Sequence, residues 1–205
     1  MNLSTFFVEP YNSRFDWVGL LIIFSLEIGI LIVLLTIKEI LNRKNGKETL
    51  SKLSKVFELI VLIGYIALVL SQTWFMSNRN YVRRINIDLF WSYRTSMEWI
   101  DGLKIENSRI LEQICLNILM FIPLGFLLPD SFVYFAEKKW KVIIAGCLFS
   151  AMIEVGQYFL HVGLFELDDL FDNTLGCFMG VMIWKIIRRV FSLKGVMSRQ
   201  ELTSN

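Results

Sequence analysis

The sequence predicts an all-α integral membrane protein, a five-helix transmembrane bundle, and two observations support this fold class. First, 55% of the 205 residues are hydrophobic and only 20% are charged, which is too apolar for an ordinary soluble domain. Second, the apolar residues come in blocks of about 20, the length that a helix needs to cross the hydrocarbon core of a bilayer. We therefore expect a single membrane domain over residues 1–205.

Five apolar windows have the length and composition of membrane-spanning helices. They cover residues 17–37, 57–76, 110–128, 142–160 and 170–187. Glu27 interrupts the first window, and its partner is not evident from the sequence. Pro123 is expected to kink the third helix and to free a backbone carbonyl, because proline lacks an amide N–H. Gly176 and Gly180 form a GxxxG step that predicts close helix packing in the fifth.

The basic residues predict which side of the membrane each loop faces. The segments after the first, third and fifth windows hold 14 of the 21 Lys and Arg residues, and these alternate segments must share one side. We therefore expect the N-terminus outside and the C-terminus in the cytoplasm. Residues 77–109 then form a long outer segment of mixed arginines, acids and aromatic residues. Such a segment is typical of an interfacial lid, or of a surface loop whose arginines pair with its own acids and with lipid phosphates.

Polar side chains of three predicted helices gather at similar depth toward the outer face. Glu154 and Gln157 are three residues apart on the fourth helix, and Asp169 and Asn173 are four apart on the fifth, so each pair shares a face. Asn117 lies in the outer half of the third helix. A charged side chain within the membrane is costly, so we expect Glu154 to face a partner or a wet cavity. The alternative is that these groups only bond neighbouring helices together.

Asp168 and Asp169 come at the start of the fifth helix and have two interpretations. Carboxylates at this position cap free N–H groups and complement the positive end of a helix, and one of the pair is expected to do so. The other is then expected to point toward Glu154. A lower-ranked alternative is that the two acids hold a divalent metal through their oxygens. No other cofactor is indicated.

Cysteine and histidine usage argues against several kinds of site. Cys115, Cys147 and Cys177 are odd in number and lie inside apolar windows, which argues against a disulfide framework and predicts small buried fillers. His161 is the single histidine, and we expect it at the membrane interface. The sequence has neither the GxSxG pattern of serine hydrolases nor the HExxH pattern of zinc proteases.

Several segments resemble the VanZ-like family. Residues 117–129, NILMFIPLGFLLP, look like its NxLxFxPxGFLLP segment, and residues 86–94 are similar to its N-L-x-P-F segment. Residues 154–159, 165–170 and 172–176 are similar, in order, to its E-xx-Q, F-D-[IV]-D-D and N-T-x-G elements. Each piece alone is weak, but the ordered combination is specific. The resemblance covers about residues 80–187.

Three positions depart from the family pattern. Leu89 replaces a proline, and Glu166 replaces the usual first aspartate of the F-D-x-D-D element. The arginine that commonly precedes this element is absent, since Gly163 and Leu164 stand there. The role of that arginine therefore cannot be carried over.

The resemblance implies a multi-pass protein of the bacterial cytoplasmic membrane that lowers susceptibility to teicoplanin-type lipoglycopeptides. We expect it to bind a lipidated or lipid-linked ligand, a cell-wall precursor or the antibiotic itself, in a polar pocket of the outer leaflet. The expected pocket residues are Asn117, Glu154, Gln157, Asp168, Asp169 and Asn173. Arg94 is expected to meet phosphates of the ligand. Other expected partners are membrane lipids, with no nucleic acid.

Two other functions remain open at the level of sequence. One is an intramembrane enzyme that modifies a lipid-linked cell-envelope precursor, with Glu154 and Asp169 as acid and base. Whether the protein turns over a substrate is not decided by the sequence. The other is a small transporter, suggested by the buried carboxylates but disfavoured by five helices that lack an inverted repeat.

Overall fold

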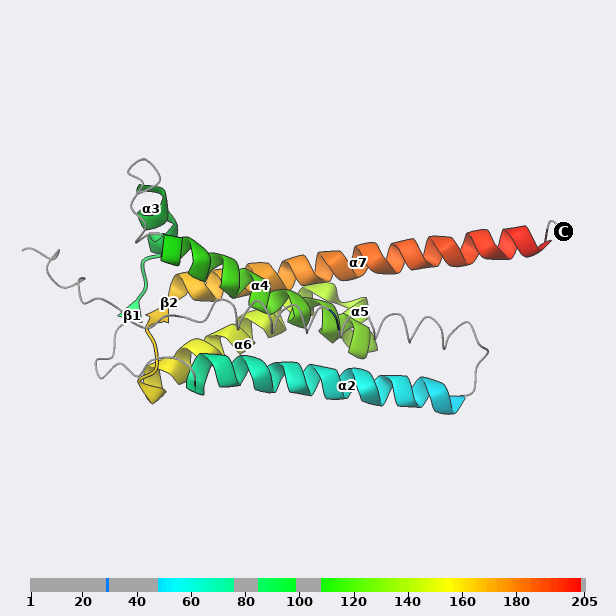
Figure 1. Cartoon of the computed structure of the whole chain (residues 1–205), viewed down its shortest axis with the longest axis horizontal. Coiled ribbons are helices and arrows are strands. Elements are labelled where there is room, and N and C mark those ends of the chain that lie inside the picture. Colours follow the sequence, from blue (N-terminus) through cyan, green and yellow to red (C-terminus); the bar gives the residue numbers. More distant parts are fainter. Residues whose placement is uncertain (1–28, 30–47, 76–84, 99–107, 204–205) are drawn as a thin grey trace, which may run out of the picture.

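The computed structural model describes residues 29, 48–75, 85–98 and 108–203, and in these residues four long helices lie alongside one another (Figure 1). They are α2 (Glu48–Leu70), α4 (Ser108–Ser131), α6 (Lys139–Leu160) and α7 (Leu167–Thr203). The shorter elements are a π-helical turn η2 (Ser71–Phe75) that continues α2, the helices α3 (Trp91–Glu98) and α5 (Val133–Glu137), and the strands β1 (Ile85–Asn86) and β2 (Phe165–Glu166).

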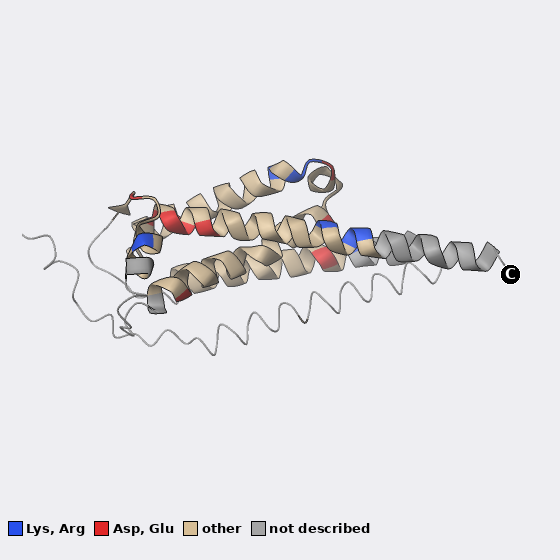
Figure 2. Ribbon diagram, turned by 90° about the horizontal axis from the view of Figure 1, so that it is seen from above, with Lys and Arg blue, Asp and Glu red and all other residues tan. Residues whose placement is uncertain are grey.

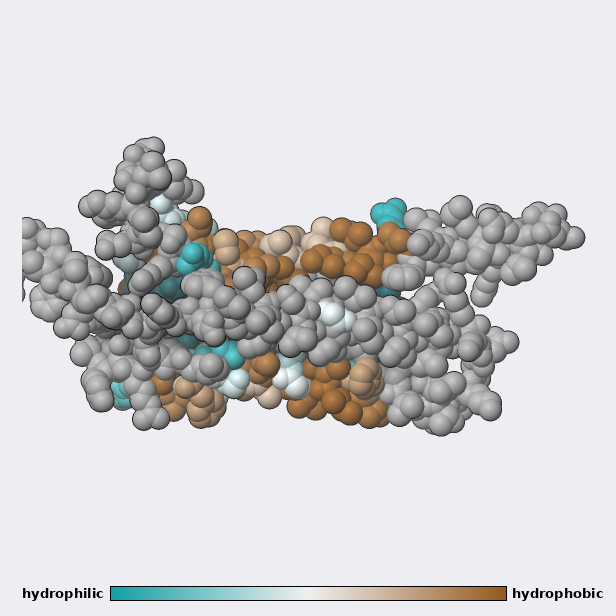
Figure 3. All heavy atoms as spheres, in the orientation of Figure 1, coloured by the Kyte–Doolittle hydropathy of each residue, from teal (hydrophilic) through white to brown (hydrophobic). Residues whose placement is uncertain are grey.

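The four long helices are long and apolar enough to cross a membrane. Their candidate spans are Lys55–Phe75, Ile110–Ser131, Lys139–Leu160 and Leu167–Val190. At 1.5 Å per residue these spans reach about 32–36 Å, which matches the thickness of the hydrocarbon core. Where Figure 3 colours the surface between the two ends of the bundle, most of it is apolar, as expected of a surface that faces lipid.

The second to fifth predicted helices are therefore confirmed, and the helix predicted over residues 17–37 lies outside the described residues apart from Gly29, which is helical. The five-helix count and the orientation of the termini stay predictions. The ends of the helices differ from those predicted: α7, expected over 170–187, begins at Leu167 and continues to Thr203. A search for apolar residues misses helical turns that carry charge, and such turns are stable where water meets the membrane.

Helix α4 continues through both Pro123 and Pro129. The hydroxyl of Tyr65 on α2 donates a hydrogen bond to the backbone oxygen of Met120, in the turn that Pro123 weakens. A neighbouring helix thus supplies a polar contact beside the missing backbone bond, as is common for prolines in transmembrane helices. The predicted kink itself stays a prediction.

Close contact between α4 and α7 forms the centre of the bundle. A Cβ atom added at Gly176 would lie 2.0 Å from the carbonyl oxygen of Ile118, and one added at Gly180 would lie 2.1 Å from that of Ile122. On α4, the same test at Gly125 gives 2.0 Å to the carbonyl oxygen of Cys177. The GxxxG step therefore packs backbone against backbone, which confirms the prediction made for it.

Large apolar side chains fill the remaining space around this contact. The buried core includes Tyr65 and Val69 of α2, Phe121, Phe126 and Leu127 of α4, Ile153 of α6, and Val181 and Trp184 of α7. Cys177 is a buried filler as expected, but Cys115 is exposed on the surface of α4 and Cys147 is half-buried. The expectation for Cys115 and Cys147 was wrong, because the type of a residue in an apolar helix does not show whether its side chain points to lipid or into the bundle.

At one end of the bundle, part of the predicted outer segment is folded onto the turn between α6 and α7. Strand β1 pairs in parallel with β2, with Ile85 opposite Phe165 and Asn86 opposite Glu166. Helix α3 follows β1 and packs against α4. The segment between α2 and α4 therefore contains a strand and a helix, where the sequence predicted an interfacial lid or a surface loop.

Candidate functional site

Acidic residues gather at the end of the bundle where α6 ends and α7 begins, where Figure 2 shows red segments. This acidic cluster consists of Glu154, Glu166, Asp168, Asp169 and Asp172. Asp169 is half-buried, and the other four are buried. Gln113 donates to both Glu166 and Asp169, and Glu154 accepts a hydrogen bond from the backbone of Glu166, so these groups lie close together. Among the described residues, none of the five forms an ion pair with a lysine or arginine.

The turn between the two helices brings these acids together. Helix α6 ends at Leu160, and the next residue, His161, has a left-handed backbone (φ 57°) that reverses the chain and an N–H that donates to the carbonyl oxygen of Gln157. Glu154, about two turns earlier, accepts a hydrogen bond of 3.0 Å from the backbone N–H of Glu166. The buried carboxylate of Glu154 thus fixes the returning chain just before α7.

Gln113 of α4 connects the cluster to a third helix. Its side-chain amide donates to Glu166 at 3.0 Å and to the two oxygens of Asp169 at 3.2 and 3.3 Å. Burial raises the pKa of Glu166 above its ordinary value and the charge of Asp168 adds to this shift, whereas the hydrogen bond from Gln113 works against it. Gln113 therefore favours the ionised form of a group that its surroundings tend to neutralise.

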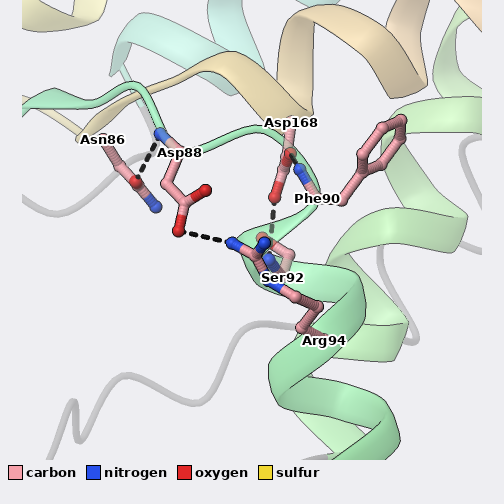
Figure 4. A network of polar contacts seen from close by, with 6 residues as sticks. All are labelled: Asn86, Asp88, Phe90, Ser92, Arg94 and Asp168. Atoms are coloured by element: carbon pink, nitrogen blue, oxygen red, sulfur yellow. Dashed lines mark hydrogen bonds and ion pairs between the residues drawn. The ribbon is translucent and has the colours of Figure 1, made fainter.

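Asp168 binds the first turn of α3 and does not cap its own helix (Figure 4). Its two carboxylate oxygens accept hydrogen bonds from the backbone N–H groups of Phe90, at 2.5 Å, and Ser92, at 2.8 Å. These are free donors at the positive end of α3, which is a natural site for an anion. Asp168 was a candidate to cap the start of its own helix, and its carboxylate instead binds N–H groups at the start of α3.

Asp172 holds α3 from a second point. It accepts a hydrogen bond from the hydroxyl of Tyr93. Burial, with the hydrogen bond and charge of Asp172, raises the pKa of Tyr93, so the hydroxyl stays protonated and remains a donor. The rings of Phe90, Tyr93 and Phe171 meet edge to face, with centroids 5.2 to 6.4 Å apart. Helix α3 is therefore a cover over the start of α7.

Three buried polar atoms of the described residues lack a hydrogen-bond partner near this cover. They are Oδ2 of Asp172, Oδ1 of Asn173 and Nδ2 of Asn117. The side-chain amide of Asn173 donates to Ser150 on α6 at 2.9 Å, so only one of its two polar ends is used. Two acceptors and one donor are thus left unpaired inside the bundle.

Two residues predicted for the site lie elsewhere. Gln157 donates at 3.3 Å to the carbonyl oxygen of Thr73 in η2, so it joins α6 to α2 and does not join Glu154. Arg94 pairs with Asp88 at 2.5 Å, and both side chains are 57% exposed (Figure 4). The structure brings together Glu154, Asp169 and Asp168 with Asn173 nearby on α7, and it does not bring Gln157 or Arg94 to them.

Gln113, Glu166, Asp172, Tyr93 and Ser150 were not among the predicted site residues. Asp172 lies one turn after Asp168 and Asp169, so helical periodicity was a usable signal for it. The contacts of Tyr93 and Gln113 join segments more than 50 residues apart in the sequence, and no local pattern predicts them.

The geometry does not pair Asp168 with Asp169 as metal ligands. Asp168 turns both oxygens to α3, while both oxygens of Asp169 face Gln113. In the described part of the chain, no three histidine, cysteine or acidic side chains are grouped as metal ligands would be. The carboxylates are instead arranged as acceptors for N–H and O–H donors.

The helices and this site define a multi-pass α-helical membrane protein with a covered acidic cluster between three of its spans. The sequence model of the VanZ/LLP1 family matches residues 56–188, and the chain belongs to this family. The match confirms the resemblance and extends it into α2, which the comparison of motifs left out. No curated protein and no solved structure was found to be similar to the chain.

Proposed function

We propose that this protein acts in the bacterial cytoplasmic membrane and lowers susceptibility to teicoplanin-type lipoglycopeptides. It does so by binding a lipidated or lipid-linked ligand at the acidic cluster. The N-terminus lies outside and the C-terminus in the cytoplasm, which places the acidic cluster in the outer leaflet.

The distribution of charge supports this orientation. Six cationic side chains lie at the end of the bundle opposite the acidic cluster: Lys138, Lys139, Lys141, Lys185, Arg188 and Arg189. Basic residues close to the ends of transmembrane helices are retained on the cytoplasmic side. The cluster then lies toward the opposite, outer surface.

The observation that carries the proposal is the set of unpaired atoms on Asn117, Asp172 and Asn173. A buried polar atom without a partner costs about 1–3 kcal/mol, so a protein rarely leaves several in one region unless water or a ligand binds them. Polar groups that only tied the helices together would be expected to bond one another. A polar group of a ligand that reaches these atoms would supply the partners that they lack.

The chemistry of the cluster selects a ligand that donates hydrogen bonds. Carboxylates accept such bonds from hydroxyl and ammonium groups, whereas a phosphate placed among five acids is repelled. Arg94, expected to meet a phosphate, is bonded to Asp88 at the surface. The sugar hydroxyls of a glycosylated ligand suit the interior site, and its acyl chain suits the apolar faces of the helices.

Replacement of Glu154 by Gln tests the proposal. The carboxamide keeps the shape of the side chain but loses the charge that holds the N–H of Glu166, so E154Q is expected to abolish most of the protection. The control is E137Q, which makes the same change at an exposed position on α5. The measurement is the minimal inhibitory concentration of teicoplanin in a susceptible host, at equal membrane levels of each variant. Full protection by E154Q would remove the cluster from the function.

One observation favours an enzyme as the second candidate. Gln113 donates to both Glu166 and Asp169, and Glu154 binds the backbone of Glu166, so several carboxylates lie close together, and neighbouring acids of this kind suit proton transfer to and from a substrate. Mass spectrometry of lipids that co-purify with the wild-type protein separates the two functions. A binding protein retains its lipid unchanged during incubation, whereas an enzyme converts it to a product of different mass and E154Q does not.

A further inference from the structure

A second polar region lies at the basic end of the bundle, far from the acidic cluster. Trp184 of α7 is buried there beside two cations: the ammonium of Lys139 lies 5.7 Å from its ring centroid and the guanidinium of Arg188 lies 5.6 Å from it. We call Lys139, Trp184 and Arg188 the tryptophan clamp. Aromatic rings attract cations placed in this way.

A single carboxylate lies within the clamp. Asp130 of α4 accepts hydrogen bonds from the indole N–H of Trp184 at 3.2 Å and from Arg188 at 2.8 Å. Within residues 130–141 and 184–190, Asp130 and Glu137 are the acids, against six cationic side chains. Positive charge therefore remains in excess, and Arg188 is 52% exposed.

Aromatic side chains place the clamp at the depth of lipid headgroups. Tyr134 of α5 and Trp140 of α6 are more than half exposed, and the ammonium of Lys141 lies 4.2 Å and 5.5 Å from their ring centroids. Exposed tyrosine and tryptophan with lysine are typical of the boundary between lipid and water. From Trp140, exposed Ile144 and Leu148 follow at intervals of four, so an apolar stripe runs along α6 into the membrane.

We propose that the tryptophan clamp binds one anionic phospholipid of the surrounding membrane. Its phosphate lies between Lys139 and Arg188, and an acyl chain follows the stripe of Trp140, Ile144 and Leu148. Charge complementarity selects an anionic headgroup over a zwitterionic one, and the adjoining apolar stripe selects a lipid over a free anion. The inference is independent of the ligand at the acidic cluster.

Native mass spectrometry of the full-length protein in detergent tests this site, with phosphatidylglycerol and phosphatidylcholine supplied in equal amounts. The wild-type protein is expected to retain phosphatidylglycerol preferentially. The variant K139Q/R188Q is expected to retain at least about 10-fold less of it. The control K185Q/R189Q removes the same charge at the same end, and its retention is expected to change less than about 2-fold.

Asp130→Asn gives a readout in the opposite direction. The amide no longer competes with phosphate for Arg188, so D130N is expected to retain more phosphatidylglycerol than the wild type. An equal fall in both double variants would show diffuse charge attraction and overturn the site. An unchanged K139Q/R188Q, a decrease in D130N, or displacement of the lipid by inorganic phosphate alone would do the same.

Discussion

Asp168 shows how one side chain joins elements that are distant in the sequence. Its carboxylate accepts from two backbone N–H groups of α3 at 2.5 and 2.8 Å, and it is buried. Phe90, the residue before α3, has a left-handed backbone (φ 65°), which is uncommon for a bulky residue. The turn that presents these N–H groups is therefore unfavourable by itself, and the carboxylate stabilises it.

Asp168→Asn is expected to loosen α3 without unfolding the bundle. An amide oxygen is a weaker acceptor than a carboxylate, and loss of such a cap costs about 1–2 kcal/mol. This corresponds to about 5- to 30-fold faster hydrogen exchange at the amides of α3. Mass spectrometry of peptides covering residues 91–98 measures the exchange.

Asp169→Asn is the matched control for this prediction, because it makes the same change at the next residue but contacts Gln113 and not α3. Its α3 peptides are expected to exchange at the wild-type rate. Equal exchange in D168N and the wild type would show that the aromatic contacts and the Tyr93 hydrogen bond hold α3 without the cap.

At the scale of elements, the contact of α4 with α7 sets the geometry of the site. Gly176 lies one turn after Asp172 and Asn173, so the distance between these two helices determines whether Asn117 and Asn173 approach each other. The glycine contact can be this close because no side chain separates the two backbones. Packing and site are therefore coupled through the same stretch of α7.

Gly176→Ala is expected to destabilise the bundle. The added methyl group would lie 2.0 Å from the carbonyl oxygen of Ile118, so the helices must separate, with an expected cost of about 1–3 kcal/mol. Gly64→Ala on α2 is the control, because an added Cβ there meets no atom within 4 Å. Alanine at position 64 is expected to be neutral or slightly stabilising. Thermal unfolding in detergent compares the two, and equal midpoints would contradict the close contact.

For the whole molecule, the sequence predicted the parts of the fold that depend on local composition. Apolar blocks located α2, α4, α6 and α7, and the GxxxG spacing identified the contact face of α7. Helix α3 was missed because its eight residues mix aromatic, basic and acidic side chains without an apolar block. Local composition cannot show that such a segment folds against a turn more than 70 residues away.

The candidate site, like the fold, was predicted only in part. Asp168 and Asp169 at the start of α7 were predicted as site residues and Glu166 and Asp172 were not, and Glu154 binds the backbone N–H of Glu166 just before α7. Gln157 does not lie beside these acids. Side chains three residues apart on a helix diverge by about 60°, so different neighbours can bind Glu154 and Gln157. Which neighbour each one meets depends on how the helices are arranged, and sequence spacing does not give that arrangement.

The proposed orientation is tested by labelling single cysteines in a variant that lacks the native ones. Ile87 and Val133 are 73% and 68% exposed at opposite ends of the bundle. A membrane-impermeant maleimide added to intact cells is expected to label I87C and to label V133C only after the membrane is opened. The reverse pattern would place the acidic cluster on the cytoplasmic side and refute the proposed binding of an outer-leaflet ligand.

The cover over the acidic cluster also has a consequence for biosynthesis. Strand β1 and the first turns of α3 leave the ribosome early, yet they bind Phe165, Glu166, Asp168 and Asp172, which are made about 80 residues later. Until then α3 has α4 as its long-helix partner in the described part of the chain. Contacts between such distant segments form late, so the nascent bundle stays open to lipid on this side until α7 has been inserted.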